Sequence, residues 1–303
     1  MTRFSRQSFL GVGSDEKLTN ATIGVVGLGG GGSHVIQQLA HLGIGGTVLV
    51  DPDIVEISNL NRLVGATPVD VAVKRQKVEV ASRAVLSLNP LARCRALQDK
   101  WQEVTDALAE CDVIIGAVDS YIERNELEAF CRRLMIPYID MGMDVHSLGE
   151  EHVIGGQVIL SFPGGPCLWC LGYLNDRKLT QEAERYGDAG AKPQVVWPNG
   201  VLASLAVGLA VQLLTPWGRR PVVAAYLEFD GNQHTVANSN RLKVMIDRPC
   251  QHYPADQVGD PLFDLRLDPV TASQAEPAAV PSRVVRLRTL WSSLLRRFRR
   301  VSR

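Results

Sequence analysis

A glycine-rich turn between an apolar run and a helical pattern is the feature that most constrains the fold of this chain. The apolar run at 22–26 leads into the segment Gly27-Leu-Gly-Gly-Gly-Gly32, and residues 33–42 carry apolar side chains at helical spacing. Glycines at the start of a helix let a phosphate group approach backbone N–H groups. The segment therefore predicts a strand, a phosphate-binding turn and a helix that covers a sheet.

The alternation of strands and helices continues through the first half of the chain. Further strands are predicted at 47–51, 112–119 and 137–141, and helices at 71–88 and 122–134. Two strand-like runs around Gly155-Gly156 and a hairpin formed by 222–229 and 233–237 predict antiparallel additions. The predicted fold class is therefore α/β, with a Rossmann-like, doubly wound, mostly parallel sheet extended by antiparallel strands.

The chain is predicted to hold one domain followed by a C-terminal extension. Residues 1–253 form the domain, in which 172–198 are expected to be a long, mobile crossover loop and 199–214 an apolar helix. Residues 254–282 have the composition of a linker, and 283–303 have the pattern of a basic amphipathic helix. Such a helix suits an acidic protein groove, the acidic body of this chain or an anionic membrane, and docking on protein is the expectation.

Composition and charge narrow the class of protein. Hydrophobic side chains make up 46% of the 303 residues, but the longest nearly uncharged apolar run, 201–214, is too short to cross a membrane. The N-terminal residues do not resemble a signal peptide and the six cysteines do not form a disulfide framework, so we expect a cytoplasmic protein. Eight of the 32 basic residues lie in 282–303, which leaves an acidic body and argues against nucleic acid as the main partner.

The glycine turn is compatible with two classes of enzyme. Gly27-x-Gly29-x-x-Gly32 is a dinucleotide-binding pattern, and Asp51 lies where an acid that binds the ribose is expected. On these residues alone, a nicotinamide- or flavin-dependent oxidoreductase is as well supported as any other interpretation. The four consecutive glycines that begin at Gly29 differ from the usual dehydrogenase spacing and leave room for a phosphate leaving group.

Three charged residues favour displacement at a phosphate over hydride transfer. Displacement at an α-phosphate needs cations beside the phosphates and a carboxylate for Mg²⁺. Arg62, Lys77 and Asp119 provide these groups, and because each follows a strand end or begins a helix, all are predicted to face one cleft. Two alternatives stay open, since Lys74 competes with Lys77 as the functional amine and Asp119 could simply cap the helix that follows it.

Taken together, these motifs resemble those of the ThiF/MoeB family of ATP-dependent activating enzymes. The matching segments are the glycine turn, Asp51-x-Asp53-x-Val-x-x-Ser-Asn59-Leu-Asn61-Arg62, Gln76-Lys77-Val78-Glu79 with Asn89-Pro90, and Asp119 before a helix. The resemblance covers roughly 3–250. It implies a homodimer that uses ATP and Mg²⁺ to adenylate the C-terminal carboxylate of a ubiquitin-like or sulfur-carrier protein, with release of pyrophosphate. The activated carboxylate would then pass to a conjugating enzyme or another acceptor.

The resemblance also implies roles for single residues. Lys77 would stabilise the charge on the α-phosphate, Asp119 would bind Mg²⁺, and Arg6 would reach the ATP of the other protomer. Asp51 would hold the ribose, while Arg62 would contact phosphates and complete the catalytic set. The implied nucleotide-binding set is Gly27, Gly29, Gly30, Gly32, Asp51, Asp53, Asn59 and Asn61.

Four residues in the second half of the domain are predicted to bind zinc. Cys167-Leu-Trp-Cys170 has the spacing of one half of a tetrahedral site, and the family usually supplies a second cysteine pair further along. This chain offers Cys250 and His252 instead. Reduced thiols left over from a lost site are the alternative, and a redox pair is disfavoured because the thioredoxin-type context is absent.

The crossover segment lacks the cysteine that thioester-forming activating enzymes carry there. Because residues 171–200 contain no cysteine, the enzyme either stops at the acyl-adenylate, transfers the acyl group to an external thiol or amine, uses a cysteine elsewhere, or uses Thr180 as an oxyester acceptor. A catalytically silent scaffold is a third class of function. The missing cysteine, the altered metal ligands and the extension favour a bacterial ubiquitin-like conjugation system over sulfur-carrier chemistry.

Overall fold

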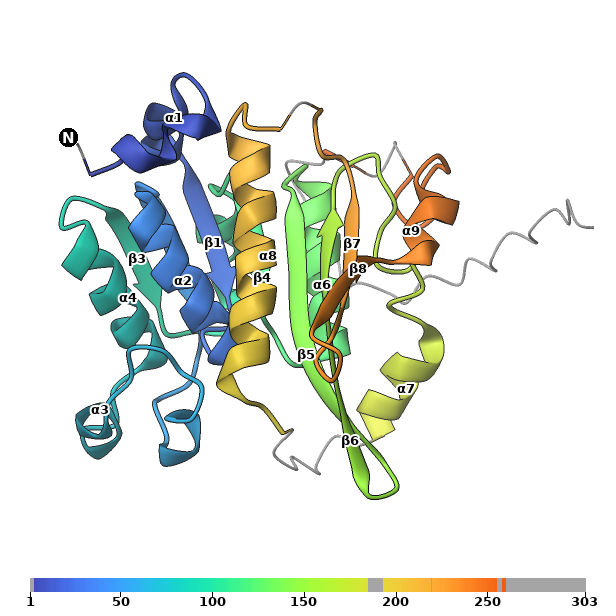
Figure 1. Cartoon of the computed structure of the whole chain (residues 1–303), viewed down its shortest axis with the longest axis horizontal. Coiled ribbons are helices and arrows are strands. Elements are labelled where there is room, and N and C mark those ends of the chain that lie inside the picture. The colour runs from blue at the N-terminus through green and yellow to red at the C-terminus, as the bar shows by residue number, and fades with distance from the viewer. Residues whose placement is uncertain (1–2, 185–192, 219, 255–257, 260–303) are drawn as a thin grey trace, which may run out of the picture. The chain divides into compact units, whose positions relative to one another are not determined.

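An eight-stranded mixed sheet runs through the molecule (Figure 1). Its strands in chain order are β1 Thr22–Val26, β2 Gly46–Val50, β3 Arg93–Leu97, β4 Val113–Gly116, β5 Tyr138–Leu148, β6 Glu151–Ser161, β7 Ala225–Asp230 and β8 Thr235–Asn238. Across the sheet the order is β3-β2-β1-β4-β5-β6-β7-β8. The first five strands of this order are parallel, and β6, β7 and β8 are added antiparallel. The predicted fold class is therefore confirmed.

The computed structural model describes residues 3–184, 193–218, 220–254 and 258–259. The chain divides into two units, Met1–Thr271 and Ala272–Arg303, and the second lies wholly outside these residues. The predicted basic helix at 283–303 lies outside them as well, and so does the predicted linker apart from residues 254, 258 and 259.

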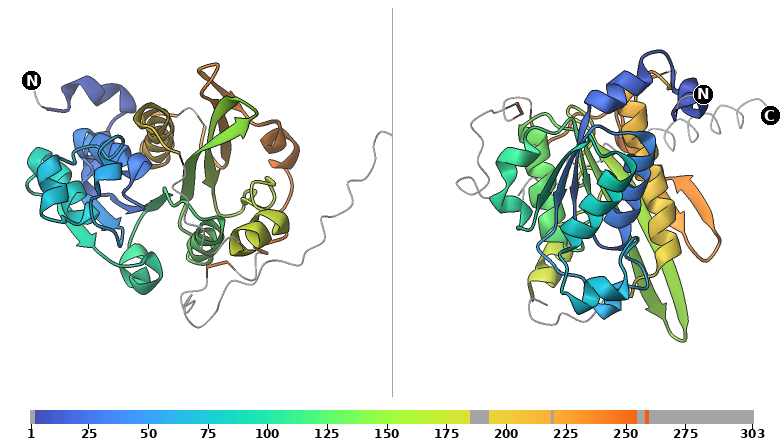
Figure 2. Two further views of the ribbon diagram at one scale, coloured as in Figure 1. Left: turned by 90° about the horizontal axis from the view of Figure 1, so that it is seen from below. Right: turned by 90° about the vertical axis from the view of Figure 1, so that its left-hand side faces the viewer.

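Helices cover both faces of the sheet (Figure 2). The helices in chain order are η1 Ser5–Leu10, α1 Ser14–Asn20, α2 Gly30–Leu42, η2 Ile57–Asn59, α3 Pro68–Ala72, α4 Lys77–Leu88, η3 Trp101–Glu103, α5 Thr105–Leu108, α6 Tyr121–Arg133, α7 Asp176–Glu184, α8 Val196–Leu214 and α9 Asn240–Met245. Ile23 and Val25 of β1 share a core with α2, α4 and α8, whereas Val26 packs with α5 and α6 on the other face. Because successive strand residues point to opposite faces, a strand covered on both sides is apolar throughout.

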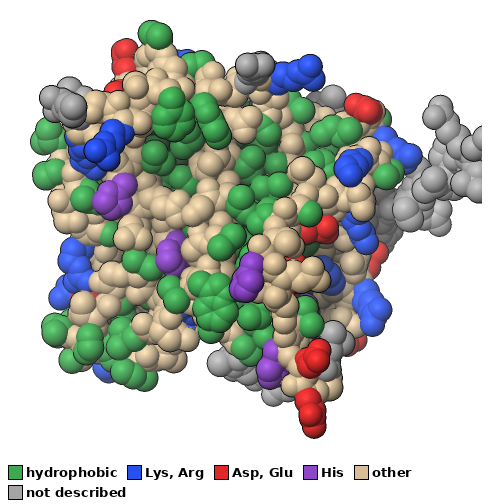
Figure 3. Space-filling view, viewed as in Figure 1, with side chains coloured by type: hydrophobic (Ala, Val, Ile, Leu, Met, Phe, Trp, Pro, Cys, Tyr) green, Lys and Arg blue, Asp and Glu red, His purple; other side chains and the backbone are tan. Residues whose placement is uncertain are grey.

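Helix α8 is long and apolar enough to cross a membrane by length and composition alone. Half of its most apolar window is nevertheless buried in the fold, where it packs on α2, β5 and β6. Hydrophobic side chains also gather over this helix on the face seen in Figure 3. Its composition is therefore accounted for by its place as a core helix.

The single helix predicted at 71–88 is wrong. Helix α3 ends at Ala72 and α4 begins at Lys77, and between them Lys74 adopts a left-handed backbone with a φ of 51°. At this break the chain pairs with the loop after β2, where the Val55 N–H donates to the carbonyl oxygen of Arg75 at 2.7 Å and the Lys77 N–H donates to that of Asp53 at 3.0 Å. The break places Lys77 at the first position of α4, beside the loop that follows β2.

Two further predictions along the chain are wrong. The turn between β5 and β6 lies at Gly149, with a φ of 65°, whereas Gly155 and Gly156 lie inside β6. The segment 172–198, predicted as a loop, contains α7. None of the residues of α7 is buried, so its sequence has no apolar repeat that would indicate a helix. In addition, the sequence pattern does not predict β3, since its side chains are partly or fully exposed at the edge of the sheet.

The close packing of α2 on the glycine turn can be tested with two glycine variants. A Cβ on Gly32 would lie 1.9 Å from the carbonyl oxygen of Gly27, whereas a Cβ on Gly208 of α8 would meet nothing within 4 Å. We expect Gly32→Ala to lower the free energy of unfolding by about 3 kcal/mol through overpacking. The control Gly208→Ala is expected to raise it by about 0.5 kcal/mol, since alanine favours a helix. Urea unfolding followed by circular dichroism measures both, and equal stability of the two variants would contradict this packing.

Candidate active site

A cavity of about 300 Å³ lies beyond the carboxyl ends of β1, β2 and β4. It brings together seven of the residues singled out by the sequence, namely Gly27, Gly29, Gly30, Asp51, Asp53, Lys77 and Asp119. Lys100, Arg124 and Asn199, from distant parts of the chain, are among the other lining residues. Doubly wound sheets bind their ligands in this position, so the cavity is the candidate active site.

The glycine turn forms one wall of this cavity. Gly27 has a φ of 85°, its N–H donates to the carbonyl oxygen of Val50 at 2.9 Å, and a Cβ there would lie 2.6 Å from the carbonyl oxygen of Ala117. A side chain is therefore excluded at this position. Helix α2 begins inside the glycine segment, at Gly30, with Gly29 as an N-cap residue that provides no side-chain acceptor. The first N–H groups of such a helix favour an anion, and a phosphate is the group this wall suits.

Asp51 connects the glycine turn to the loop that follows β2. Its Oδ2 accepts a hydrogen bond from the Leu28 N–H at 2.7 Å, and its Oδ1 accepts one from the Asp53 N–H at 2.9 Å. The Lys77 ammonium lies 3.6 Å from Asp51 Oδ1 and 2.7 Å from Asp53 Oδ2. Burial raises the pKa of Asp51, and the charge of Lys77 opposes that shift. The two carboxylates therefore hold the ammonium at the edge of the cavity.

Asp119 faces the cavity from the loop that follows β4. The N-cap of α6 is Ser120, whose side chain accepts a hydrogen bond from the Glu123 N–H, so the N-cap position considered for Asp119 belongs to Ser120. Asp119 Oδ1 accepts a hydrogen bond from Gln194 Nε2 at 3.2 Å. The segment that enters α8 is thereby connected to the same site.

Five residues of the predicted set lie outside the lining of this cavity in the described part of the chain. They are Arg6, Gly32, Asn59, Asn61 and Arg62. Arg6 is exposed on η1, and Asn59 Oδ1 accepts a hydrogen bond from the Glu56 N–H. Asn61 Nδ2 donates to the carbonyl oxygen of Gln194 at 3.1 Å.

Arg62 remains beside the glycine turn. Its Cδ lies 3.4 Å from the position that a Cβ on Gly30 would take, and its guanidinium donates to the carbonyl oxygen of Ser58 and to Asn61 Oδ1. The guanidinium is thus bound to its own loop while its stem borders the turn.

Arg124 was not singled out by the sequence, although it lines this cavity. It is buried on α6, where its guanidinium pairs with Asp140 Oδ1 at 2.5 Å and also donates to the carbonyl oxygen of Val118. Little in the sequence marks Arg124 as a site residue, because an arginine in an amphipathic helix usually lies on the solvated face. The partner Asp140 is brought to it by the sheet.

A second cavity of about 300 Å³ adjoins the first. Both cavities are lined by Asp119, Arg124, Gly142 and Met143. The second extends between β5, β6, β7 and α7, because its lining includes residues from each of these elements. A ligand in the first cavity can therefore be approached along the second.

The four predicted zinc ligands form a cluster. Their ligand atoms all lie within 4.8 Å of one another. The Sγ atoms of Cys167 and Cys170 are 3.6 Å apart, as are those of Cys170 and Cys250, and His252 Nδ1 lies 3.4 Å from the sulfur atoms of Cys167 and Cys170. Zn–S bonds of about 2.3 Å in a tetrahedron require S–S distances of about 3.8 Å, so this donor set fits zinc. Hydrogen bonds from neighbouring thiols lower the pKa of Cys170, which favours the thiolate that binds a metal.

Comparison with known proteins decides the family. The ThiF family profile matches residues 4–249. This chain belongs to the ThiF family. It is 33% identical over 225 residues to the sulfur carrier protein ThiS adenylyltransferase of Escherichia coli, which covers 71% of this chain and 84% of that protein. It is 32% identical over 257 residues to the molybdopterin-synthase adenylyltransferase of the same organism, covering 83% and 95%.

The structure of this chain is also similar to a solved structure. The crystal structure of E. coli MccB with ATP has a TM-score of 0.62 and 22% sequence identity, covering 80% of this chain and 72% of that one. At this identity the likeness establishes the shared Rossmann-like fold. The two ThiF-family relatives above are both named as adenylyltransferases, so the oxidoreductase alternative is not favoured.

The pairing of Lys77 with Asp51 predicts a pH-dependent loss of stability. Lys77→Met leaves Asp51 buried without its cation, and we expect the free energy of unfolding at pH 7.5 to fall by about 3 kcal/mol. Burial already raises the pKa of Asp51, and the charge of Lys77 opposes that rise. Removing the charge of Lys77 therefore raises the pKa of Asp51 further. The folded state then binds a proton more tightly than the unfolded state, so the loss shrinks as the pH falls through the folded-state pKa. Denaturant unfolding at pH 7.5 and 4.5, with exposed Lys74→Met as the control, measures this, and an equal loss at both pH values would contradict the pairing.

The cysteine–histidine cluster predicts one zinc ion per chain. We expect purified protein to retain about one equivalent after dialysis, and Cys170→Ser to lose most of it, since three donors bind zinc more weakly than four. The control is Cys94→Ser, which changes a half-buried cysteine outside the cluster. Elemental analysis by mass spectrometry gives the content. Zinc-free protein, or equal content in both variants, would contradict the assignment.

Proposed function

We propose that this chain uses ATP to adenylate the C-terminal carboxylate of a small ubiquitin-like or sulfur-carrier protein and releases pyrophosphate. The observation that carries the proposal is the cavity in which the glycine turn, Lys77 and Asp119 meet. The names of the two E. coli relatives support this activity. In ATP the reacting atom is the α-phosphorus, and these residues supply the charges that its displacement needs.

In the proposed reaction the carboxylate oxygen of the carrier attacks the α-phosphorus. An O–P bond to the carboxylate forms, the bond to the β-phosphate breaks, and pyrophosphate leaves with the electron pair. Lys77 moves from Asp53 to the α-phosphate oxygens, an exchange that is open to it because Asp53 is 64% exposed. The N-terminus of α2 and the glycine turn bind the remaining phosphates. Asp51 holds the ribose.

Asp119 is the residue that we expect to hold Mg²⁺. A carboxylate oxygen is the ligand this ion prefers, and Asp119 lines the cavity beside the glycine turn. When bound, the ion neutralises charge that develops on the departing pyrophosphate. Asp119 would exchange its hydrogen bond from Gln194 for this role.

The predicted residues that do not line the cavity could contact ATP only if a second protomer supplied them or if the loop after β2 shifted. We propose a homodimer in which the exposed Arg6 of one protomer reaches the ATP of its partner. Arg62 borders the turn, and contact with phosphate would require its guanidinium to leave Ser58. Asn59 and Asn61 lie in the same segment and would move with it. We propose that the reaction takes place in the cytoplasm. The activated carboxylate would pass to a conjugating enzyme or another nucleophile.

Pyrophosphate exchange tests the proposed activity. Protein, ATP, Mg²⁺ and E. coli ThiS, used as a probe carrier, are expected to move labelled pyrophosphate into ATP. Lys77→Ala and Asp119→Asn should each lower the exchange rate by about 100-fold or more, because both remove charge stabilisation from the transition state. Lys74→Ala, which changes an exposed lysine outside the lining, is the control.

Two results would contradict the proposal. One is the absence of exchange with ThiS and with every other ubiquitin-like carrier tried. The other is reduction of a nicotinamide or flavin cofactor by the protein, which would restore the oxidoreductase interpretation.

A further inference from the structure

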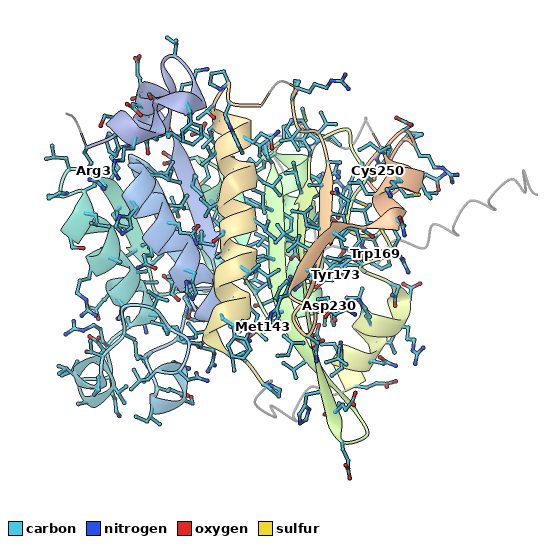
Figure 4. All side chains as sticks on the ribbon, viewed as in Figure 1. Arg3, Met143, Trp169, Tyr173, Asp230 and Cys250 are labelled. Atoms are coloured by element: carbon cyan, nitrogen blue, oxygen red, sulfur yellow. The ribbon has the colours of Figure 1, made fainter. Side chains whose placement is uncertain are left out.

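Lys178 of α7 places an amine in the second cavity. Its Nζ lies 4.7 Å from the ring centroid of Tyr121 and 4.6 Å from that of Tyr173, and it donates to the carbonyl oxygen of Tyr173 at 2.8 Å. Figure 4 labels Tyr173 and Met143, which line the same cavity. Among the described residues, no carboxylate forms an ion pair with this ammonium.

The position of Lys178 is fixed by a second contact from the same face of α7. Glu182, one helical turn further on, accepts hydrogen bonds from Ser120 Oγ at 3.1 Å and from the Ile122 N–H at 2.9 Å. These donors lie at the start of α6, directly after Asp119. Helix α7 is thus docked by polar contacts beside the candidate active site.

The surroundings of Lys178 favour its neutral form. Burial lowers the pKa of its amine, and the neighbouring positive charges of Arg124 and Arg241 lower it further, while Asp144 and Asp140 act in the opposite direction. Removal from water and proximity to other cations are the two means by which proteins activate a lysine as a nucleophile. A neutral amine has the lone pair that attack on a carbonyl carbon requires.

The cavity of Lys178 opens onto the place where the carboxylate would be activated. The two cavities share Asp119, Arg124, Gly142 and Met143. An acyl-adenylate whose AMP lies in the first cavity would extend its acyl group through this shared region. The amine of Lys178 is therefore on the route by which the carrier enters.

Thr180 is less well placed to accept an acyl group. It is exposed on α7 and does not line either cavity. Two residues along a helix correspond to a rotation of about 200°, so Lys178 and Thr180 point in nearly opposite directions. The chain also has no cysteine between Cys170 and Cys250. Of the two nucleophiles of α7, Lys178 and Thr180, Lys178 is the one that lines a cavity.

We propose that Lys178 accepts the activated acyl group and that the enzyme thereby conjugates its carrier to itself through an amide bond. This inference rests on the proposed function. The ammonium first loses a proton to solvent, and the neutral nitrogen attacks the carbonyl carbon of the acyl-adenylate. The C–N bond forms, the C–O bond to the phosphate breaks, and AMP leaves with the electron pair. The extra proton on nitrogen passes to water or to Asp144.

A preformed acyl-adenylate tests the acceptor without requiring the enzyme to make one. The probe is the adenylate of N-acetyl-glycyl-glycine, incubated with the full chain and mapped by peptide mass spectrometry. We expect occupancy of Lys178 at least tenfold above that of Lys243, an exposed lysine on α9. Excess ATP should reduce labelling of Lys178 at least fivefold by competing for the first cavity. The adduct should survive neutral hydroxylamine, because an amide is stable to it and an ester is not.

Two variants and one further reaction complete the test. Lys178→Arg keeps the positive charge but should lose the adduct, whereas Lys243→Arg and Thr180→Ala should keep it. Thermal unfolding of each variant verifies that it is folded. Labelling spread evenly over exposed lysines, labelling insensitive to ATP, or a hydroxylamine-sensitive adduct on Thr180 would overturn the inference.

The natural reaction separates this inference from the proposed function. With ATP and a carrier that supports pyrophosphate exchange, intact mass spectrometry should show the enzyme joined to one carrier. Exchange without an adduct on Lys178 would overturn the inference and leave the proposed function in place. Failure of exchange would overturn the proposed function, while the acyl-adenylate probe still decides whether Lys178 is a reactive acceptor.

Discussion

The buried carboxylate of Asp51 is the constraint on which the site depends. It directly follows β2, accepts hydrogen bonds from the N–H groups of Leu28 and Asp53, and faces the ammonium of Lys77. The glycine turn, the loop after β2 and the start of α4 are thereby held in one arrangement. Because Asp51 is only 5% exposed, it is stabilised as an anion by these partners rather than by water. The same contacts keep a cation at the edge of the cavity, where a triphosphate would need it.

Much of this arrangement could be predicted from the sequence because it depends on local pattern. Apolar runs that end in glycine or an acid indicated the strands, and the spacing from Gly27 to Asp51 indicated a nucleotide site. The motif position also favoured Lys77 over Lys74, and of these two lysines Lys77 is the one that lines the cavity. The break before α4 was missed because the backbone contacts made there, such as that of Lys77 with Asp53, join residues far apart in sequence.

What the sequence could not predict depends on tertiary contacts. Helix α7 docks through Lys178 and Glu182 and buries none of its residues, so it had no apolar period to recognise. The sequence pattern alone gives Arg124 the character of a solvated helix residue. Its buried ion pair with Asp140 depends on the pairing of strands in the sheet. All four residues of the cysteine–histidine cluster were predicted, two from their spacing and Cys250 and His252 with the help of the family resemblance, although their meeting depends on the chain returning to Cys167. Polar contacts between residues far apart in sequence therefore give this site the features that a local nucleotide-binding pattern does not predict.

The central claim is that the carboxylate of a carrier becomes bonded to the α-phosphorus of ATP. A carrier whose C-terminal carboxylate contains a heavy oxygen isotope, treated with enzyme, ATP and hydroxylamine, tests this most directly. Hydroxylamine attacks the carbonyl carbon, so one labelled oxygen leaves with the phosphate to which it had been joined. The account predicts labelled AMP and unlabelled pyrophosphate. Label in inorganic phosphate with formation of ADP would mean attack at the γ-phosphorus and would contradict the account.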